Sequence, residues 1–493
     1  MARNLEFEAA FHPKTIAVVG ASRTPYLFGD FVACLQNAGF PGRIYPINPK
    51  AARAGEKIHG LKVYPDLVSV PEHIDLVTVS IPAPDIIPML EDCIAANAKN
   101  IQIYTAGFRE AGTAKGAELE QRLQEIAKRG GLNILGPNCM GLHVPASKIT
   151  TWLTFNPEPG PVGFISQSGG HAGVFILEAI EYGVKVSKVI SYGNAAVIDS
   201  TDLLEYLAAD PDTKIICMYV EGVRDGAKLT SLVRKINKEK PVIFWKGGAT
   251  DCGARAAASH TGSLGGEREV WDAFFKQTGA VRVDSAEELL NVSMIFLNIK
   301  RLRGNRVALI GGGGGNSVAA ADICDHTGLE VPHFSQKTQR ELLSFIPAEG
   351  TITRNPIDIA FAMLDLNVLL RSLKLSVNDP HIDAIIFALP PGVMLLATAV
   401  RQAQDKSTFD EALQKQSQIV VEILSRFNNE NPSGKPLIIV LQPGVFHFML
   451  GQREKLRTEL LKNGVPTYLS LEQASHALGK FFKYQEFHRR RNK

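Results

Sequence analysis

One histidine, His260, stands in a segment made almost entirely of small and hydroxyl-bearing residues. The segment reads AAASHTGSLGG over residues 256–266. It is too polar and too rich in glycine for a good core helix, so we expect a loop that brings the imidazole against a ligand. A neutral imidazole is a competent nucleophile towards phosphorus. His260 is therefore the first candidate for chemistry.

An imidazole that takes up a phosphoryl group needs a carboxylate to fix its tautomer and to stabilise the cationic product. Glu221 lies in YVEG at residues 219–222, directly after a Val/Ile-rich run. We expect it at the same sheet edge as His260 and predict that it is this carboxylate. A helix-capping or solvated carboxylate at the end of a strand explains its position at least as well.

A second loop, GFISQSGGHAG at residues 163–173, predicts an anion site. A strand leads into a Ser/Gly turn and then a helix, so hydroxyls, backbone N–H groups and the helix dipole would converge on an anion. The GxSxG spacing of a hydrolase nucleophile is absent. His171 could be catalytic, or it could face solvent or a phosphate at the helix start.

Further Val/Ile-rich runs end in turns that are small, kinked and weakly polar: GASR (20–23), NPK (48–50), SIPAP (80–84), TAGF (105–108) and GPNCMG (136–141). Such a series suits a long, flat ligand. The first turn lacks the GxGxxG spacing, and the second ends in Lys50, which suits a phosphate rather than a ribose. A plain turn without a ligand remains an alternative for GASR. Cys139 could be a nucleophile, although a small buried residue is the favoured interpretation.

These turns must be positioned by parallel sheets. The Val/Ile-rich runs alternate with segments of helical spacing, which predicts an α/β protein with helices on both faces of its sheets. They form three groups of five: 15–19, 43–47, 75–80, 100–104 and 132–135; 162–165, 187–191, 214–220, 241–245 and 281–283; 306–310, 329–331, 382–389, 436–441 and 466–469. We expect domains at 1–147, 148–299 and 300–493, with a proline-rich linker at 145–161.

The third group opens with five glycines at residues 311–315. The run resembles a phosphate cradle, but no lysine follows at Walker spacing, so a P-loop is rejected. The glycines could instead approach another backbone or a domain interface. NPID at residues 355–358 is a further turn without an assigned role.

The order of these motifs, from GASR through SQSGG, YVEG and ASHTGSLGG to NPID, resembles the ADP-forming acyl-CoA synthetases (acetate–CoA ligase type) over nearly the whole chain. They are relatives of succinyl-CoA synthetase. The resemblance implies a Rossmann-like CoA-binding domain followed by two flavodoxin-like, doubly wound domains. The third would be mostly structural and interfacial.

The resemblance also implies roles for individual residues. His260 matches the phosphorylated histidine and Glu221 the carboxylate that holds it. The phosphate-binding loop would comprise Ser166, Gln167, Ser168, Gly169 and Gly170. Coenzyme A would be bound by Gly20, Ala21, Ser22, Arg23, Lys50, Pro82, Ala83, Ala106, Gly107 and Asn138. His171 stands where many relatives carry an aliphatic residue.

The implied reaction interconverts acyl-CoA, ADP and phosphate with a carboxylic acid, CoA and ATP, through an acyl phosphate and phosphohistidine. Such enzymes need an ATP-grasp module for the nucleotide and its Mg²⁺, and three domains leave no room for one. We therefore expect a separate β subunit, in an αβ or α₂β₂ assembly. A CoA-binding or regulatory protein without ligase activity is the alternative, and an NAD-linked dehydrogenase is a weaker third. Acetate, larger aliphatic acids and aryl acids are all compatible with the sequence.

Composition narrows the class of protein. The 493 residues are 45% hydrophobic and 21% charged, and 53 basic against 50 acidic residues leave a net charge of +3. So small an excess favours neither nucleic acid nor an anionic membrane as a partner. Six scattered cysteines without a CxxC pair predict no zinc site and no disulfide framework, and the N-terminus lacks a signal-like apolar core. These features predict a cytoplasmic protein.

Overall fold

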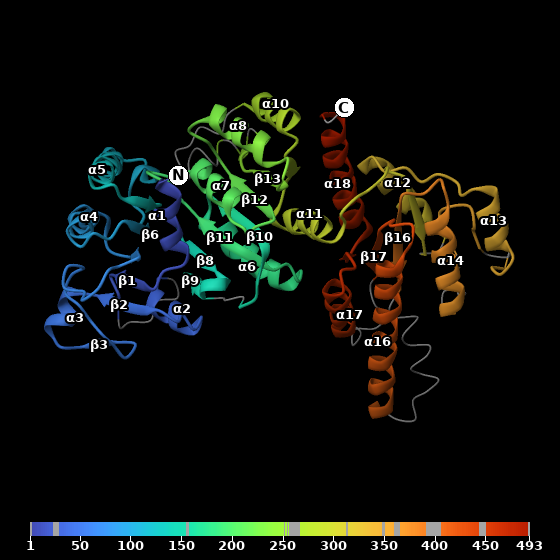
Figure 1. Cartoon of the computed structure of the whole chain (residues 1–493), viewed down its shortest axis with the longest axis horizontal. Coiled ribbons are helices and arrows are strands. Elements are labelled where there is room, and N and C mark those ends of the chain that lie inside the picture. The colour runs from blue at the N-terminus through green and yellow to red at the C-terminus, as the bar shows by residue number, and fades with distance from the viewer. Residues whose placement is uncertain are drawn as a thin grey trace. The chain divides into compact units, whose positions relative to one another are not determined.

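The computed structural model describes residues 2–22, 29–153, 157–250, 252–253, 255, 267–311, 314–347, 351–358, 365–390, 406–442 and 450–491. The chain forms two compact units, residues 1–290 and 291–493, and the division falls within α11 (Ala286–Asn298). Figure 1 shows the α/β arrangement of both units. Among the described residues, no helix has the length and apolar character needed to span a bilayer.

The first unit begins with a five-stranded parallel sheet in the order β2-β1-β5-β6-β7. Its strands are β1 (Thr15–Val19), β2 (Arg43–Ile47), β5 (Leu76–Val79), β6 (Asn100–Ile103) and β7 (Asn133–Leu135). All five strands expected in this group are confirmed. β3 (Lys57–Ile58) and β4 (Leu61–Lys62) form a separate antiparallel pair.

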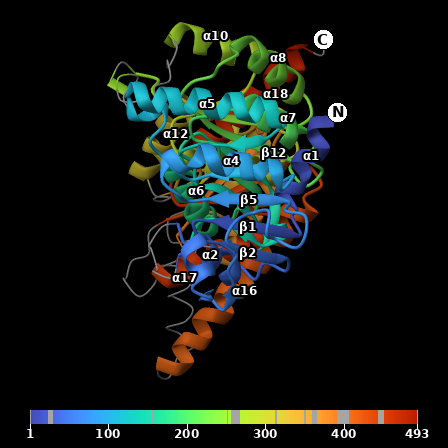
Figure 2. The same ribbon diagram turned by 90° about the vertical axis from the view of Figure 1, so that its left-hand side faces the viewer.

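Both faces of this sheet are covered because successive side chains of a strand point to opposite sides. Ile16 and Val18 join one apolar cluster, whereas Ala17 and Val19 join another. Figure 2 shows α5, α4, β5 and β1 one below the other, and both helices contribute residues to the second cluster. The helices are α1 (Ala2–Phe11), α2 (Phe31–Asn37), α3 (Pro49–Arg53), α4 (Ile86–Ala95) and α5 (Ala114–Gly130), with short η1 (Ala83–Asp85) and η2 (Arg109–Ala111).

A second sheet in the same unit has seven strands in the order β14-β13-β12-β10-β11-β8-β9. The five parallel strands expected here are confirmed: β10 (Pro159–Ser166), β11 (Val186–Ser191), β12 (Ile215–Val220), β13 (Val242–Lys246) and β14 (Val281–Val283). Its helices are α6 (Gly169–Glu181), α7 (Ser200–Ala209), α8 (Gly226–Ile236) and α10 (Arg268–Thr278).

Two further strands of this sheet were not expected. β8 (Gly141–Val144) pairs antiparallel with β11, and β9 (Ile149–Thr150) pairs with β8 across η3 (Pro145–Ser147). The prolines between residues 145 and 161 suggested a plain linker, but the short apolar run GLHV before them finds a free edge of the sheet. The second sheet therefore takes strands from both sides of residue 147. The domain boundary expected at that residue stays a prediction.

The second unit contains a four-stranded parallel sheet, β15-β16-β17-β18. Its strands are β15 (Val307–Ile310), β16 (Ala384–Leu389), β17 (Leu437–Leu441) and β18 (Thr467–Tyr468). The strand expected at 329–331 is wrong, since only an isolated bridge joins Glu330 to Arg306. Pro332 follows at once, and it has no N–H with which to extend the pairing.

The helices of the second unit are α12 (Gly314–Thr327), α13 (Gln336–Leu343), α14 (Leu366–Asn378), α16 (Lys406–Glu430), α17 (Leu450–Lys462) and α18 (Leu471–Arg491). The NPID turn supports the sheet of this unit. Asn355 donates from Nδ2 to the carbonyls of Val307 and Pro332 and accepts from the Leu309 N–H. The role of this turn among the described residues is structural.

The two sheets of the first unit share one winding. In each, the first of the parallel strands in sequence, β1 or β10, lies between the second and the third parallel strand. The chain order reverses beside that first strand, and ligands of such sheets bind beyond the carboxyl ends of the strands at this reversal. The GASR and SQSGG turns therefore occupy equivalent positions in the two sheets.

Candidate active site

The turn after β10 builds the start of α6. Ser166 Oγ donates to the Ser168 carbonyl at 2.7 Å, and Ser168 caps the helix by accepting from the His171 N–H at 3.3 Å. The N–H groups of Gly169 and Gly170 have no partner within the described ranges. Unpaired N–H groups at a helix start, together with the helix dipole, favour an anion.

Gln167 is buried and joins this turn to the end of β12. Its Oε1 accepts hydrogen bonds from the Glu221 N–H at 2.8 Å, the Gly222 N–H at 3.2 Å and the Tyr192 hydroxyl at 3.4 Å. Its own N–H donates to the Tyr219 carbonyl at 3.0 Å. Gln167 therefore positions the segment that carries Glu221.

Glu221 is only 6% exposed. The Tyr219 hydroxyl donates to its Oε1 at 3.0 Å, whereas its Oε2 is buried and accepts no hydrogen bond from the described residues. Buried polar atoms without a partner are uncommon and need an explanation. The cap of α8 is Asp225, so the interpretation of Glu221 as a solvated or helix-capping carboxylate is wrong.

Lys246, at the end of β13, is a residue that the sequence reasoning missed. Its Nζ is buried and donates to the carbonyls of Glu221, at 2.9 Å, and of Gly247. The Trp271 ring lies 5.2 Å from Nζ. Burial lowers the pKa of Lys246 to about 8, although Glu221 acts in the opposite direction. A lysine closing an apolar strand next to two glycines was the available signal.

His171 belongs to a group of three rings beside Glu221. Its ring centroid lies 4.5 Å from that of Tyr219 and 4.5 Å from that of Trp245, and the latter two are 4.6 Å apart. Burial and the nearby Glu221 carboxylate raise the pKa of Tyr219, so its hydroxyl stays protonated and can donate to Glu221. The structure therefore gives His171 a packing role against these two rings, in addition to the catalytic and phosphate-facing roles that the sequence left open.

The turn after β1 lies close against the backbone of the neighbouring strand exit. Gly20 has φ +88°, and a Cβ there would lie 2.1 Å from the Ser80 carbonyl oxygen. Asn48 Nδ2 donates to the Ala21 carbonyl at 2.8 Å, while Asn48 Oδ1 caps α3 by accepting from the Lys50 N–H. Gly20, Ala21 and Ser22 are thereby joined to Lys50 at one sheet edge, where the Lys50 side chain is exposed.

The other predicted CoA-binding residues continue along this edge. Pro82 and Ala106 are exposed. Gly107 has φ +106° and lies against Ala83, where an added Cβ would be 3.3 Å from the Ala83 Cβ. The structure therefore brings the exits of β5 and β6 together.

The exit of β7 connects this edge with the turn after β10. The Asn138 N–H donates to the Thr105 carbonyl, and its Nδ2 donates to Asn194 Oδ1 at 3.4 Å. Next to it, Met140 packs so closely on Gly169 that a Cβ there would lie 2.6 Å from Met140 Cγ. Asn138 thus lies between the predicted CoA edge and the predicted phosphate loop.

Cys139 is buried, and its thiol points to the carbonyls of Ile103 and Leu135. Burial raises the pKa of this thiol to about 12. A thiol that stays protonated is a poor nucleophile, so the interpretation as a small buried residue is confirmed. His260 and Arg23 lie outside the described residues.

Comparisons with known proteins agree with the two sheets of the first unit. A family model described as a CoA binding domain matches residues 14–145, and a succinyl-CoA ligase like flavodoxin domain matches residues 159–296. The acetate–CoA ligase [ADP-forming] II subunit alpha of Pyrococcus furiosus is 34% identical over 468 residues, which are 95% of each chain.

The acetate–CoA ligase [ADP-forming] I of Archaeoglobus fulgidus is 37% identical over 390 residues, covering 78% of this chain and 55% of that protein. The chain thus spans about half the length of that relative. Among solved structures, a dinucleotide-forming acetyl-coenzyme A synthetase 1 of Ca. Korarchaeum cryptofilum, in complex with phosphate and ADP, has a TM-score of 0.78. It is 27% identical and covers 98% of this chain and 97% of its own.

Proposed function

The chain belongs to the ADP-forming acetate–CoA ligases, and from this membership we propose that it is the α subunit of an NDP-forming acyl-CoA synthetase. Phosphate attacks the thioester of acyl-CoA, which gives an acyl phosphate and free CoA. The imidazole of His260 then takes the phosphoryl group and releases the carboxylate. ADP then takes the phosphoryl group from His260 and becomes ATP. Every step runs in both directions.

The observation that carries this proposal is the buried Oε2 of Glu221, which has no partner among the described residues. We assign the missing donor to the imidazole N–H of His260. A fixed carboxylate holds the other ring nitrogen ready for phosphorus and stabilises the cationic phosphohistidine. Tyr219, Gln167 and Lys246 support this role because they fix the position of Glu221.

We assign the phosphoryl group to Ser166, Gln167, Ser168, Gly169 and Gly170. The unpaired N–H groups of Gly169 and Gly170 at the start of α6 support this assignment, since they match the charge of a phosphate without needing to reorganise. The capped helix holds them in place before the phosphoryl group arrives.

Coenzyme A belongs, in this proposal, along the carboxyl edge of the first sheet. Its phosphorylated nucleotide lies near Gly20, Ala21, Ser22, Arg23 and Lys50, its pantetheine passes Pro82, Ala83, Ala106 and Gly107, and its thiol reaches Asn138. The close contacts of small residues leave backbone accessible along this edge, which fits a long ligand. The contact of Met140 with Gly169 then brings the thioester near the phosphate loop.

We place the nucleotide and its Mg²⁺ on a separate ATP-grasp β subunit, in an αβ or α₂β₂ assembly. The Pyrococcus furiosus relative is itself named subunit alpha, which supports a partner chain. The six free cysteines support a reducing, cytoplasmic setting.

The test uses this chain alone, because an acyl phosphate can donate the phosphoryl group without the nucleotide. Incubation with acetyl [³²P]phosphate should give an acid-labile, base-stable label on His260. The His260→Ala chain should take up no label, whereas the matched His381→Ala chain should label normally. Label that persists on His260→Ala would contradict the proposal.

A further inference from the structure

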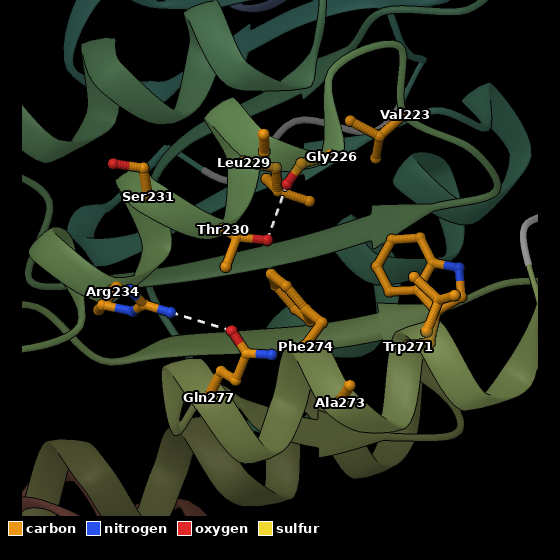
Figure 3. A pocket seen from close by; sticks show the side chains of 12 residues that line it. Val223, Gly226, Leu229, Thr230, Ser231, Arg234, Trp271, Ala273, Phe274 and Gln277 are labelled. Carbon is orange, nitrogen blue, oxygen red and sulfur yellow. Dashed lines mark hydrogen bonds between the residues drawn. The ribbon is translucent and has the colours of Figure 1, made fainter.

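A groove between α8 and α10 lies apart from the residues assigned so far. It has a volume of about 730 Å³, within the ~300–1,000 Å³ range of small-molecule sites. Figure 3 shows side chains of both helices converging on it, with Leu229 and Thr230 from α8 and Trp271 and Phe274 from α10. The middle of the groove is mainly apolar, as ligand sites usually are.

One end of the groove is polar and positively charged. Arg234 Nη2 on α8 donates to Gln277 Oε1 on α10 at 3.0 Å, so this bridge crosses the groove (Figure 3). Gln277 is neutral, and Arg234 has no ion pair with any residue that the structure describes. No Asp or Glu occurs in α8 itself. The positive charge at this end therefore has no acidic partner among the residues that the structure describes.

The opposite end is an aromatic surface open to solvent. Trp271 is half-buried, and Val270 beside it is 62% exposed. Val223, at the start of the chain that enters α8, faces Trp271 across the groove (Figure 3). Covering these side chains would remove apolar area from water and stabilise a bound apolar group.

We propose that this groove binds a small organic anion with an aromatic or branched apolar body. The carboxylate pairs with the Arg234 guanidinium, which is suited to holding it through two parallel hydrogen bonds. The body lies along Phe274 and reaches Trp271. The charge at one end and the aromatic surface at the other define the chemical class and the orientation of the ligand.

The groove is also connected to Glu221, a link whose effect on activity rests on the proposed function. Trp271 forms the groove wall and lies 5.2 Å from Lys246 Nζ, which donates to the Glu221 carbonyl at 2.9 Å. A ligand that displaces the indole changes the surroundings of this cation and hence the segment that carries Glu221. The bound anion therefore regulates phosphoryl transfer.

Binding is tested by calorimetric titration of the full chain with 4-phenylbutyrate, in excess acetate to occupy any site for a small acid. We expect one binding site. Arg234→Gln should weaken binding about tenfold or more, since it removes a charge-assisted hydrogen bond. Ala227→Phe, an exposed helical position at the groove, should block it. Lys235→Gln, the next residue on α8 and outside the groove lining, should bind as the unchanged chain does.

Two results would overturn the assignment. Equal affinity for the unchanged chain and the Arg234→Gln and Ala227→Phe variants, or no binding at millimolar concentration, would exclude this ligand class. Sedimentation showing a dimer for the unchanged chain and a monomer for Ala227→Phe would assign the groove to a second copy instead.

The regulatory link has its own readout. Saturating 4-phenylbutyrate should change the rate of labelling by acetyl [³²P]phosphate in the unchanged chain and leave the rate of Ala227→Phe unaltered. Binding without any change in rate would overturn the link while leaving the binding site established. Absence of label in both chains would instead count against the proposed function.

Discussion

The turns after β1 and β10 occupy the same position in two sheets of the same winding, yet their surroundings differ. The first turn contacts backbone, with Gly20 against the Ser80 carbonyl and Asn48 against the Ala21 carbonyl. In the second, the buried side chain of Gln167 accepts a hydrogen bond from the N–H of Glu221, which is itself buried. One arrangement leaves an edge of small residues for a long ligand, whereas the other holds a carboxylate out of water for a reaction.

The difference teaches that the strand–turn–helix unit alone does not decide between binding and chemistry. Both turns offer small residues and backbone N–H groups at a strand end. The second turn has an ionisable pair on the strands beside it, since Val220 and Lys246 are directly paired and Glu221 follows at once. Group transfer at the second turn therefore depends on what β12 and β13 contribute.

The largest expected effect comes from Glu221→Gln. The variant keeps the shape of the side chain but removes the charge that stabilises a cationic phosphohistidine, so labelling by acetyl [³²P]phosphate should slow about 10²-fold or more. The rate is measured by quenched labelling of the full chain. Asp225→Asn, a change at the nearby cap of α8, is the matched control and should label at the unchanged rate. Equal rates for all three chains would remove the distinction between the two turns.

A smaller effect is expected at the other turn. Gly20→Ala introduces a Cβ that meets the Ser80 carbonyl oxygen, so the turn must shift and CoA should bind about tenfold more weakly. Labelling by acetyl phosphate should change less than about twofold, because the turn after β10 is untouched. Calorimetry with CoA and the labelling assay measure the two effects.

Gly55→Ala separates backbone strain from the steric clash in that experiment. Gly55 also has a positive φ, +63°, but an added Cβ there meets nothing within 4 Å. It should leave CoA affinity unchanged. Loss of labelling in Gly20→Ala with intact CoA binding would reverse the roles given to the two turns.

The smallest effect concerns the pH dependence of stability at the second turn. The folded-state pKa of Lys246 is about 8, below its usual value of 10.5. Below pH 8 both states carry the charge, so the folded state bears the full cost of burying it. Between about pH 8 and 10.5 the unfolded state binds more protons, and the free energy of unfolding gains a contribution that rises with pH.

Lys246→Met should abolish that rise. Urea unfolding of both chains between pH 7 and pH 10.5 measures it, and Lys238→Met, an exposed lysine outside the site, serves as the control. A variant that retains the full pH dependence would show that Lys246 titrates normally in the folded chain.

The sequence was sufficient for the parallel strands of the first unit because their patterns are local. Runs such as TIAVV are buried at every position and apolar at all but the first, as expected of strands covered on both faces. Where pairing depended on distant partners, the sequence was misleading. GLHV became β8 because β11 offered an unpaired edge, and residues 329–331 failed to form a strand because Pro332 follows them.

The candidate site also divides into residues that local sequence patterns indicated and a residue whose role depends on a distant contact. Residue types and order indicated Glu221 and the SQSGG turn, and the fold brings them together through Gln167. Lys246 escaped notice because its contact with the Glu221 carbonyl joins residues 25 positions apart on adjacent strands. FWKGG shows a lysine that closes an apolar strand before two glycines, but this position alone does not tell whether the lysine is buried or solvated.

The amino-acid sequence by itself determined the alternation of strands and helices, the small-residue turns at the strand ends and the candidate pair of Glu221 with His260. These follow from propensity and side-chain chemistry, which act over a few residues. Only the tertiary structure decided that Glu221 is buried with one unpaired oxygen, that Cys139 is inert and that α8 and α10 leave a groove between them. Burial and pairing depend on residues that are distant in the chain and adjacent in space, so no stretch of sequence specifies them alone.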